Sequence, residues 1–238
     1  MKLKDLINEI QVVKKINFKP ELEIKSIHVD SREVQGGGLF VCIIGENNDG
    51  HDFALDAVKK GTYAVITSKE LDLDICQIVV KSTSEAISKI AANFYDNPTK
   101  KLNVIGITGT NGKTTSTFIV KHILDEVGEE CGLIGTIGVD TGDKFYPAVL
   151  TTPQAIDLQK YFFEMVSNGC KHVVMEVSSH ALDLKRVDNI DFDIAAITNI
   201  SQDHLDYHKD MGNYIMAKAK LFKMANKTSI INFDDKYR

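Results

Sequence analysis

The chain has 238 residues with a formal net charge of −5, and 43% of its residues are hydrophobic. These values are typical of a globular protein with one large or two modest domains. The acidic balance provides no basic surface for nucleic acid, so we expect no nucleic-acid partner. No run approaches about 20 apolar residues, and the N-terminus has acidic side chains and no long apolar core. The sequence therefore predicts no membrane-spanning segment and no secretion, and it favours the cytoplasm.

The four cysteines are far apart in apolar surroundings and form no C-x-x-C pair; they are Cys42, Cys76, Cys131 and Cys170. This distribution predicts reduced, mostly buried thiols and no structural zinc.

The first part of the chain has the spacing of a small α/β domain. Predicted helices begin at Leu3, at Asp52 and after the capping residue Ser82. Predicted strands cover residues 24–29, 39–44, 64–67 and 77–80. The segment 97–101 is polar and contains Pro98, which disfavours a helix in the residue before it. We therefore place a boundary here, between a domain at 1–98 and a domain at 102–238.

Strands and helices alternate more regularly in the second part. Predicted strands cover 102–108, 133–139, 172–177, 194–200 and 229–232, and predicted helices start at Lys113 and cover 154–168 and 211–224. This alternation predicts a mainly parallel, doubly wound sheet. Such sheets bind ligands at the carboxyl ends of their strands.

The stretch Gly106–Thr115 lies at a predicted strand-to-helix turn, where phosphate groups bind. Gly109 and Gly112 allow backbone N–H groups to approach an anion, Lys113 reaches the outer phosphates, and Thr114 provides a hydroxyl for magnesium. Ile107 occupies the first glycine position of the usual pattern, so this is a variant phosphate loop. The alternative is a glycine-rich turn with a solvated lysine, which the coincidence of strand, Gly-Lys-Thr and helix disfavours.

Two further polar clusters each follow a predicted strand. Glu176 ends an apolar strand and would be costly to bury unpaired, so a metal, a lysine or solvent must compensate its charge. Magnesium suits it, because Mg²⁺ takes one or two carboxylates together with phosphates. The second cluster contains Asp203, His204, Asp206 and His208. From chemistry alone it is equally well a capped polar loop or a metal site, and a nearby phosphate loop favours magnesium over zinc.

The ordered set of motifs resembles the Mur ligase family, and within it the MurE type. The matching segments are 30–32, 49–53, 106–115, 150–153, 176–182, 198–206 and 217–222. The two first-domain motifs distinguish this type from folylpolyglutamate synthetase, which shares the phosphate loop. The resemblance implies an α/β fold with a small N-terminal nucleotide-sugar-binding domain. A mainly parallel, doubly wound P-loop-type ATP-binding domain would follow it, incomplete and without the amino-acid-binding domain.

The resemblance also implies residue roles. ATP would be bound by Gly109, Thr110, Asn111, Gly112, Lys113, Thr114 and Thr115, with Lys113, His204 and Lys218 as catalytic residues. Magnesium would be bound by Thr114, Glu176 and His204, and by Lys218 after its conversion by CO₂ to a carbamate. The substrate would be bound by Val29, Ser31, Asn47, Asn48, Thr151, Thr152, Ser178 and Arg186. Without the family, Lys218 would be interpreted as an ordinary exposed helix lysine, like Lys220 and Lys223.

The function implied is ATP-dependent amide-bond formation in peptidoglycan precursor synthesis, by a monomer. L-Lysine or meso-diaminopimelate would be added to UDP-N-acetylmuramoyl-L-alanyl-D-glutamate through an acyl-phosphate. Leu184 departs from the family, because some relatives have a substrate-binding glutamine there. We expect this chain to be inactive alone. The alternative function is a non-catalytic nucleotide-sugar-binding paralogue, whereas a switch GTPase is disfavoured because no Asn-Lys-x-Asp motif occurs.

Overall fold

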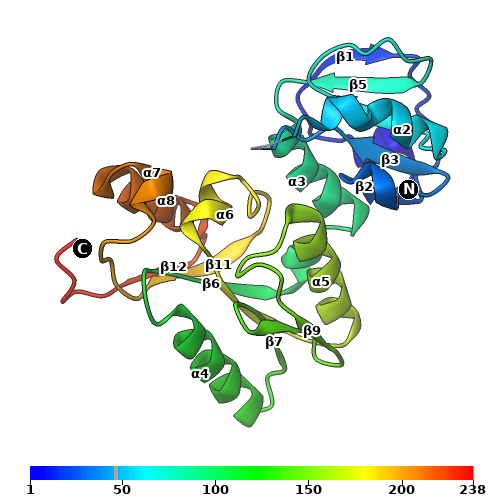
Figure 1. Cartoon of the computed structure of the whole chain (residues 1–238). Coiled ribbons are helices and arrows are strands. Elements are labelled where there is room, and N and C mark those ends of the chain that lie inside the picture. Colours follow the sequence, from blue (N-terminus) through cyan, green and yellow to red (C-terminus); the bar gives the residue numbers. More distant parts are fainter. Residues whose placement is uncertain (46–47, 238) are drawn as a thin grey trace. The chain divides into compact units, whose positions relative to one another are not determined.

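The computed structural model describes residues 1–45 and 48–237 and divides the chain into two compact units, Met1–Phe94 and Tyr95–Arg238 (Figure 1). The predicted substrate residue Asn47 lies outside the described residues. Each unit has its own sheet, so the two are described separately. In the described part of the chain, no helix combines the length and the apolar character that crossing a membrane requires.

The first unit is a five-stranded sheet in the order β1-β5-β4-β3-β2. The strands are β1 (Val12–Ile16), β2 (Ser26–His28), β3 (Gly38–Val41), β4 (Ala64–Thr67) and β5 (Cys76–Val80). The helices are α1 (Leu3–Leu6), α2 (Ala54–Lys59) and α3 (Thr83–Phe94), with short 3-10 turns η1 (Ser31–Glu33) and η2 (Gly50–Phe53). Only β1 runs antiparallel to its neighbour. The strands β3, β4 and β5 are buried along their whole length, as expected of parallel strands with both faces covered.

The strand β1 was not predicted from the sequence. It is an edge strand, and Lys14 and Lys15 are exposed on it. Charged side chains on an edge strand block pairing with other chains, and they also remove the apolar alternation that reveals a strand. The predicted strands at 24–29 and 39–44 are confirmed as shorter segments, β2 and β3.

The second unit is a seven-stranded sheet in the order β12-β11-β6-β10-β7-β8-β9. The strands are β6 (Asn103–Thr108), β7 (Cys131–Ile134), β8 (Gly138–Asp140), β9 (Phe145–Pro147), β10 (His172–Glu176), β11 (Phe192–Ile197) and β12 (Thr228–Ile231). The helices are α4 (Lys113–Glu126), α5 (Ala155–Ser167), α6 (Ser179–Asp183), α7 (Leu205–His208) and α8 (Met211–Met224), after the 3-10 turn η3 (Pro98–Lys101). The five strands from β12 to β7 are parallel, which confirms the predicted mainly parallel α/β fold.

The single strand predicted at 133–139 is wrong. The chain reverses after Ile134, Gly135 N–H donates to Gly138 O at 3.0 Å, and β8 returns antiparallel to β7. The turn residues Thr136 and Ile137 are β-branched and favour a strand, so the residue types on both sides of Gly135 do not reveal this reversal.

Helices cover both faces of this sheet. One face packs against α5, α6 and α8, and their core cluster includes Leu158, Phe162 and Leu221. The opposite face packs against α4 alone among the described helices, as Figure 1 shows below the sheet. The central strand β6 lies between β11 and β10, where the strand order changes direction. Its carboxyl end leads directly into the predicted phosphate loop, the usual ligand position in such sheets.

Candidate active site

The loop between β6 and α4 has the backbone of a phosphate-binding turn. Gly109 has φ of 136° and Gly112 has φ of 83°, conformations that favour glycine. A Cβ at Gly109 would also lie 2.0 Å from Thr198 Oγ1. Ile107 points into the core cluster of Cys131 and Leu133, so the position that is glycine in the usual pattern belongs to the buried strand here.

Residues at the end of β11 hold the loop in place. Thr110 N–H donates to Asn199 O at 2.8 Å, and Asn111 N–H donates to Asn199 Oδ1 at 3.1 Å. The Asn199 amide returns a bond to Asn111 O at 3.0 Å, and Thr198 Oγ1 donates to the same oxygen at 2.7 Å. Thr198 and Asn199 therefore fix the shape of the phosphate loop. The sequence motif that contains these two residues does not reveal this role.

Two lysines meet at one carbonyl of this loop. Lys113 Nζ donates to Gly109 O and Thr110 O, both at 2.9 Å, and Lys218 Nζ donates to Gly109 O at 2.8 Å. Burial lowers the pKa of Lys113, and the negative charges of Glu176 and Asp203 oppose this effect. The loop therefore concentrates positive charge where a phosphate would bind.

Lys218 is buried, with only 2% of its surface exposed, contrary to the appearance of an ordinary surface lysine. Its Nζ lies 4.6 Å above the ring of Tyr214, whose hydroxyl is 3.1 Å from Thr110 Oγ1. Burial, reinforced by the charge of Lys113 and opposed by Asp203, lowers the pKa of Lys218 to about 7. A substantial fraction of this amine is therefore neutral near pH 7. Sequence reasoning missed Tyr214, although it lies one helical turn before Lys218.

Glu176 lies at the end of β10, facing the start of α4, and is 1% exposed. Thr114 Oγ1 is 2.9 Å from both of its carboxylate oxygens. Thr136 N–H donates to Oε1 at 2.8 Å, and Thr136 Oγ1 donates to Oε2 at 3.3 Å. A Cβ at Gly135 would lie 2.4 Å from Oε1, so the β7–β8 turn fits closely around the carboxylate. A hydroxyl and a carboxylate beside a phosphate loop fit the preference of Mg²⁺ for oxygen ligands.

His204 begins α7 with φ of 51°, and about half of its side chain is exposed. Its ring lies 4.8 Å from that of His180, which in turn lies 5.6 Å from His208. Burial lowers the pKa values of His180 and His208, so these imidazoles favour the neutral form. Within residues 1–45 and 48–237, no group of three or more His, Cys, Asp or Glu side chains could hold a metal ion. Of the predicted magnesium ligands, Thr114 and Glu176 are hydrogen-bonded to each other. In the described part of the chain, no hydrogen bond or ion pair joins His204 to either of them.

The predicted peptide-binding residues gather beside Glu176. Thr152 Oγ1 donates to Glu176 O at 2.9 Å and accepts from Ser178 N–H at 3.0 Å. Arg186 Nη1 donates to Thr152 O at 3.4 Å, and Thr151 Oγ1 lies 3.1 Å from Thr136 Oγ1.

In the first unit, the predicted residues lie near the carboxyl ends of parallel strands. Val29 directly follows β2 and is exposed, whereas Ser31 is buried at the start of η1. Asn48 O accepts a bond from Gly45 N–H at 2.9 Å in the segment after β3. His51 anchors this segment to the end of β4, because its ring contacts Asp49 and accepts from Ser68 N–H at 3.0 Å. Sequence reasoning assigned no role to Ser68.

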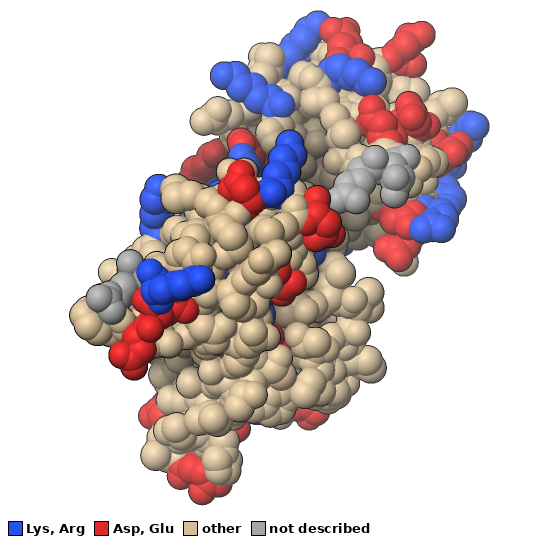
Figure 2. Space-filling view, turned by 60° about the vertical axis from the view of Figure 1, so that its left-hand side comes forward, with Lys and Arg blue, Asp and Glu red and all other residues tan. Residues whose placement is uncertain are grey.

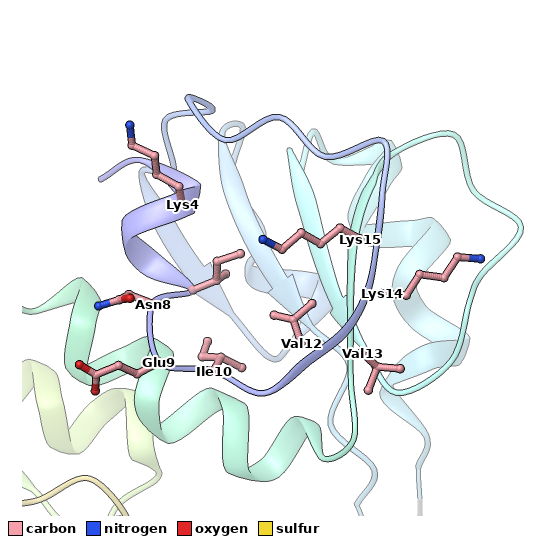
Figure 3. Close-up of a pocket in the computed structure, with 9 residues that line it drawn as sticks. Lys4, Asn8, Glu9, Ile10, Val12, Val13, Lys14 and Lys15 are labelled. Atoms are coloured by element: carbon pink, nitrogen blue, oxygen red, sulfur yellow. The ribbon is translucent and has the colours of Figure 1, made fainter.

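A groove also lies away from these residues, in the first unit. This open groove of about 650 Å³ lies beside β1 and is lined by Lys4, Asn8, Glu9, Val13 and Lys15 among others (Figure 3). None of the predicted site residues lines it, and Lys4 and Lys14 are already paired with Glu21 and Glu70.

Curated proteins similar to this chain align with its whole length. It is 47% identical to the UDP-N-acetylmuramoyl-L-alanyl-D-glutamate--2,6-diaminopimelate ligase of Caldanaerobacter subterraneus subsp. tengcongensis, with 100% of this chain and 49% of the relative covered. It is 48% identical to ligase 1 of the same name from Clostridium acetobutylicum, with the same coverage. A solved structure of such a ligase superposes with a TM-score of 0.81 at 26% identity, covering 100% of this chain and 48% of that one. The chain thus spans about half the length of the curated relatives it matches.

Two family descriptions match successive parts of the chain. The Mur ligase middle domain matches residues 107–238, and the description "Mur ligase family, catalytic domain" matches residues 23–95. The first match contains the phosphate loop, Glu176 and Lys218, and it covers more than half of the chain. The chain therefore belongs to the Mur ligase family.

Proposed function

We propose that this chain is the nucleotide-sugar-binding and ATP-binding half of an ATP-dependent ligase. The ligase adds diaminopimelate to UDP-N-acetylmuramoyl-L-alanyl-D-glutamate, the reaction named for its relatives. One observation carries the proposal. Lys113 and Lys218 converge on Gly109 O, while Glu176 faces Thr114 on the neighbouring turn. This arrangement provides cations for the phosphates and an oxygen pair for their metal ion.

ATP binds in the loop from Gly109 to Thr115, with its phosphates at the N-terminus of α4. Backbone N–H groups and the helix dipole favour the anion there. Lys113 exchanges its two loop carbonyls for the outer phosphates, and its charge stabilises the negative charge that spreads as the γ-phosphoryl is transferred. Thr110, Asn111 and Gly112 shape the turn, and Thr115 lies beside the metal-binding Thr114.

Thr114 and Glu176 would hold a magnesium ion, which would neutralise phosphate charge when bound. Glu176 is preorganised for this role because Thr136 fixes its carboxylate. His204 would contribute to a second magnesium site, as the family resemblance implies.

Lys218 becomes a carbamate in this proposal. Its neutral Nζ attacks the carbon of CO₂, an N–C bond forms, and one proton leaves the nitrogen for solvent. The product is an anionic oxygen ligand in place of a cation. The depressed pKa supports this step, because only the neutral amine is nucleophilic.

The acyl acceptor is the D-glutamate carboxylate of the sugar peptide. Thr151, Thr152, Ser178 and Arg186 bind this end of the substrate, next to Glu176 and the phosphates. The carboxylate oxygen attacks the γ-phosphorus, an O–P bond forms as the bond to the bridging oxygen of ADP breaks, and ADP leaves. The neutral amine of the incoming diamino acid then attacks the acyl carbon of the acyl-phosphate, phosphate leaves, and the nitrogen loses a proton to give the amide. No described residue is assigned to that diamino acid.

The first unit binds the uridine nucleotide through Val29, Ser31 and the segment that includes Asn47 and Asn48. His51, three residues after Asn48, is held at the end of β4, because its ring accepts a hydrogen bond from Ser68 N–H.

Thermal-shift measurements test both binding sites in one preparation. We expect UDP-N-acetylmuramoyl-L-alanyl-D-glutamate and MgATP each to raise the Tm, as any ligand of the folded state does. Lys113→Ala is expected to remove the ATP shift and keep the sugar-peptide shift, whereas Val29→Asp does the reverse. A folded chain whose Tm responds to neither ligand contradicts the proposal.

The same preparation is expected to show no ADP release that depends on both sugar peptide and diaminopimelate. Turnover by this chain alone would refute the requirement for the other half of the ligase.

A further inference from the structure

The segment 198–201 follows β11 and lies against the phosphate loop. Asn199 accepts hydrogen bonds from Thr110 N–H and Asn111 N–H, and its side-chain amide donates to Asn111 O. The contact is close, because a Cβ at Gly109 would lie 3.1 Å from Asn199 O. A shift of this segment would therefore move the loop as well.

The turn after β12 contacts the same segment from the neighbouring strand. β12 lies next to β11 and runs parallel to it, so the carboxyl ends of the two strands are adjacent (Figure 1). Asn232 Nδ2 donates to Thr198 O at 2.9 Å, and Asp235 Oδ2 accepts from Ile200 N–H at 2.7 Å. These two bonds hold the backbone immediately before and immediately after Asn199.

Asp235 accepts a hydrogen bond on each of its carboxylate oxygens. Oδ2 accepts from Ile200 N–H, and Oδ1 accepts from Tyr237 N–H at 2.8 Å. The bonds from Ile200 and Tyr237 lower the pKa of Asp235, so this side chain is ionised near neutral pH. Hydrogen bonds to an ionised acceptor are roughly twice as strong as those between neutral groups. Ile200 is buried, so its N–H would be costly to leave without this partner.

The shape of the loop matters because the surface provides little general attraction for an anion. On the face that Figure 2 shows, Lys and Arg side chains of the described residues are interspersed with Asp and Glu side chains. Binding of a triphosphate therefore depends on Lys113, on Lys218 and on the backbone N–H groups of the loop. Such N–H groups bind an anion well only when the backbone holds them in a convergent arrangement.

We propose that Asp235 and Asn232 are positioning residues of the phosphate loop and act on it through Asn199. Each of the two side chains fixes a backbone atom beside Asn199, and Asn199 fixes the loop. Loss of either side chain frees the segment 198–201, so the loop loses its shape and ATP binds more weakly. The effect on ATP rests on the proposed ATP-binding function, whereas the effect on the loop is present without a ligand.

Amide hydrogen exchange, measured by NMR on the ligand-free chain, tests the effect on the loop. In Asp235→Ala we expect Thr110 N–H and Asn111 N–H to exchange at least about fivefold faster than in the wild type. Val174 N–H, in the buried strand β10, is expected to keep its wild-type rate. Unchanged exchange of the two loop amides overturns the proposal. Acceleration of Val174 by the same factor also overturns it, because this would indicate a general loss of stability.

Asp234→Ala is the matched control for this measurement. Asp234 is the adjacent residue and is exposed, and its carboxylate has no hydrogen-bond or ion-pair partner among the described residues. We expect wild-type exchange of all three amides in this variant. Acceleration of the loop amides equal to that in Asp235→Ala would overturn the specific role of Asp235.

Titration of MgATP into the same proteins tests the consequence for binding. We expect the Kd to rise at least about fivefold in Asp235→Ala and in Asn232→Ala and to stay unchanged in Asp234→Ala. Asp235→Asn keeps an acceptor oxygen, so it is expected to recover much of the affinity. Wild-type affinity in folded Asp235→Ala and Asn232→Ala overturns the proposal. A wild type that binds no MgATP contradicts the proposed function instead, and hydrogen exchange then decides the positioning role.

Discussion

Replacing Lys218 with Met removes a buried cation while keeping a side chain of similar length. The pKa of this lysine falls from 10.5 to about 7 on folding. At about 1.36 kcal/mol per pKa unit, burial of the ammonium and its repulsion by Lys113 together cost on the order of 5 kcal/mol. The hydrogen bond to Gly109 O returns roughly 2 kcal/mol of that, since bonds to charged groups are worth about 1.5–3 kcal/mol. We therefore expect Lys218→Met to raise the free energy of unfolding by about 3 kcal/mol at neutral pH.

The pH dependence follows from the direction of the shift. Below about pH 7 the lysine is protonated in both the folded and unfolded states, so the full cost is present. Between about pH 7 and 10.5 the unfolded chain binds a proton that the folded chain lacks, and the wild-type stability rises with pH. The advantage of Lys218→Met should therefore be largest at and below neutral pH and should disappear towards pH 10.5.

Urea unfolding of both proteins in CO₂-free buffer, from about pH 6 to about pH 10, measures this difference. Adding bicarbonate at pH 8 is expected to stabilise the wild type and leave Lys218→Met unchanged, because only the lysine can form a carbamate. If the difference in unfolding free energy is constant across the pH range, or if Lys218→Met is destabilising at neutral pH, the account of Lys218 as a buried, neutralisable amine is refuted.

Three further changes test the surroundings of the loop. Glu176→Gln keeps the shape but removes the charge, so ATP affinity measured by calorimetry should fall at least tenfold with Mg²⁺ and stay the same without it. Gly135→Ala places a Cβ 2.4 Å from Glu176 Oε1 and should cost about 1–3 kcal/mol in urea unfolding. Gly36→Ala, with nothing within 4 Å, is its matched control and should be neutral. Tyr214→Phe removes the hydroxyl at Thr110 and should cost about 1 kcal/mol of unfolding free energy and weaken ATP binding.

For each of these three substitutions, one result would contradict the prediction. An unchanged magnesium dependence in Glu176→Gln would remove this carboxylate from the metal site. Equal stability of the two alanine variants would mean that the β7–β8 turn does not constrain Glu176. If Tyr214→Phe binds ATP with wild-type affinity, the hydroxyl of Tyr214 has no role in ATP binding by the loop.

Local sequence signals predicted the elements around the phosphate loop well. The strand, the glycines and the helix start at Lys113 are all coded within a dozen neighbouring residues, and β6 and α4 match them. The predicted helix at 211–224 matches α8 because its period is regular throughout. The strand predicted at 133–139 failed because the two glycines, Gly135 and Gly138, enclose β-branched Thr136 and Ile137, which favour a strand although they form the turn.

Burial of polar residues was the least predictable feature. Lys218 and Lys220 look alike in the sequence, yet Lys218 is buried at Gly109 and Lys220 pairs with Asp183 at the surface. The two lysines differ because one face of α8 packs against the phosphate loop, which is distant in the sequence. Hydrophobic periodicity carries no information about such a contact. The same holds for Thr136, whose contact with Glu176 depends on the β7–β8 reversal. The resemblance to the Mur ligase family singled out Lys218 but gave no sign of Tyr214 beneath it.

The account's central claim is that the loop from Gly109 to Thr115 binds ATP with magnesium. Isothermal titration of MgATP into the wild type and into Lys113→Ala tests it most directly. We predict saturable binding to the wild type that becomes weaker when Mg²⁺ is chelated, and binding of MgATP to folded Lys113→Ala that is weaker by at least tenfold. A folded wild-type chain that binds no MgATP, or that binds it equally well without Lys113, would contradict the claim.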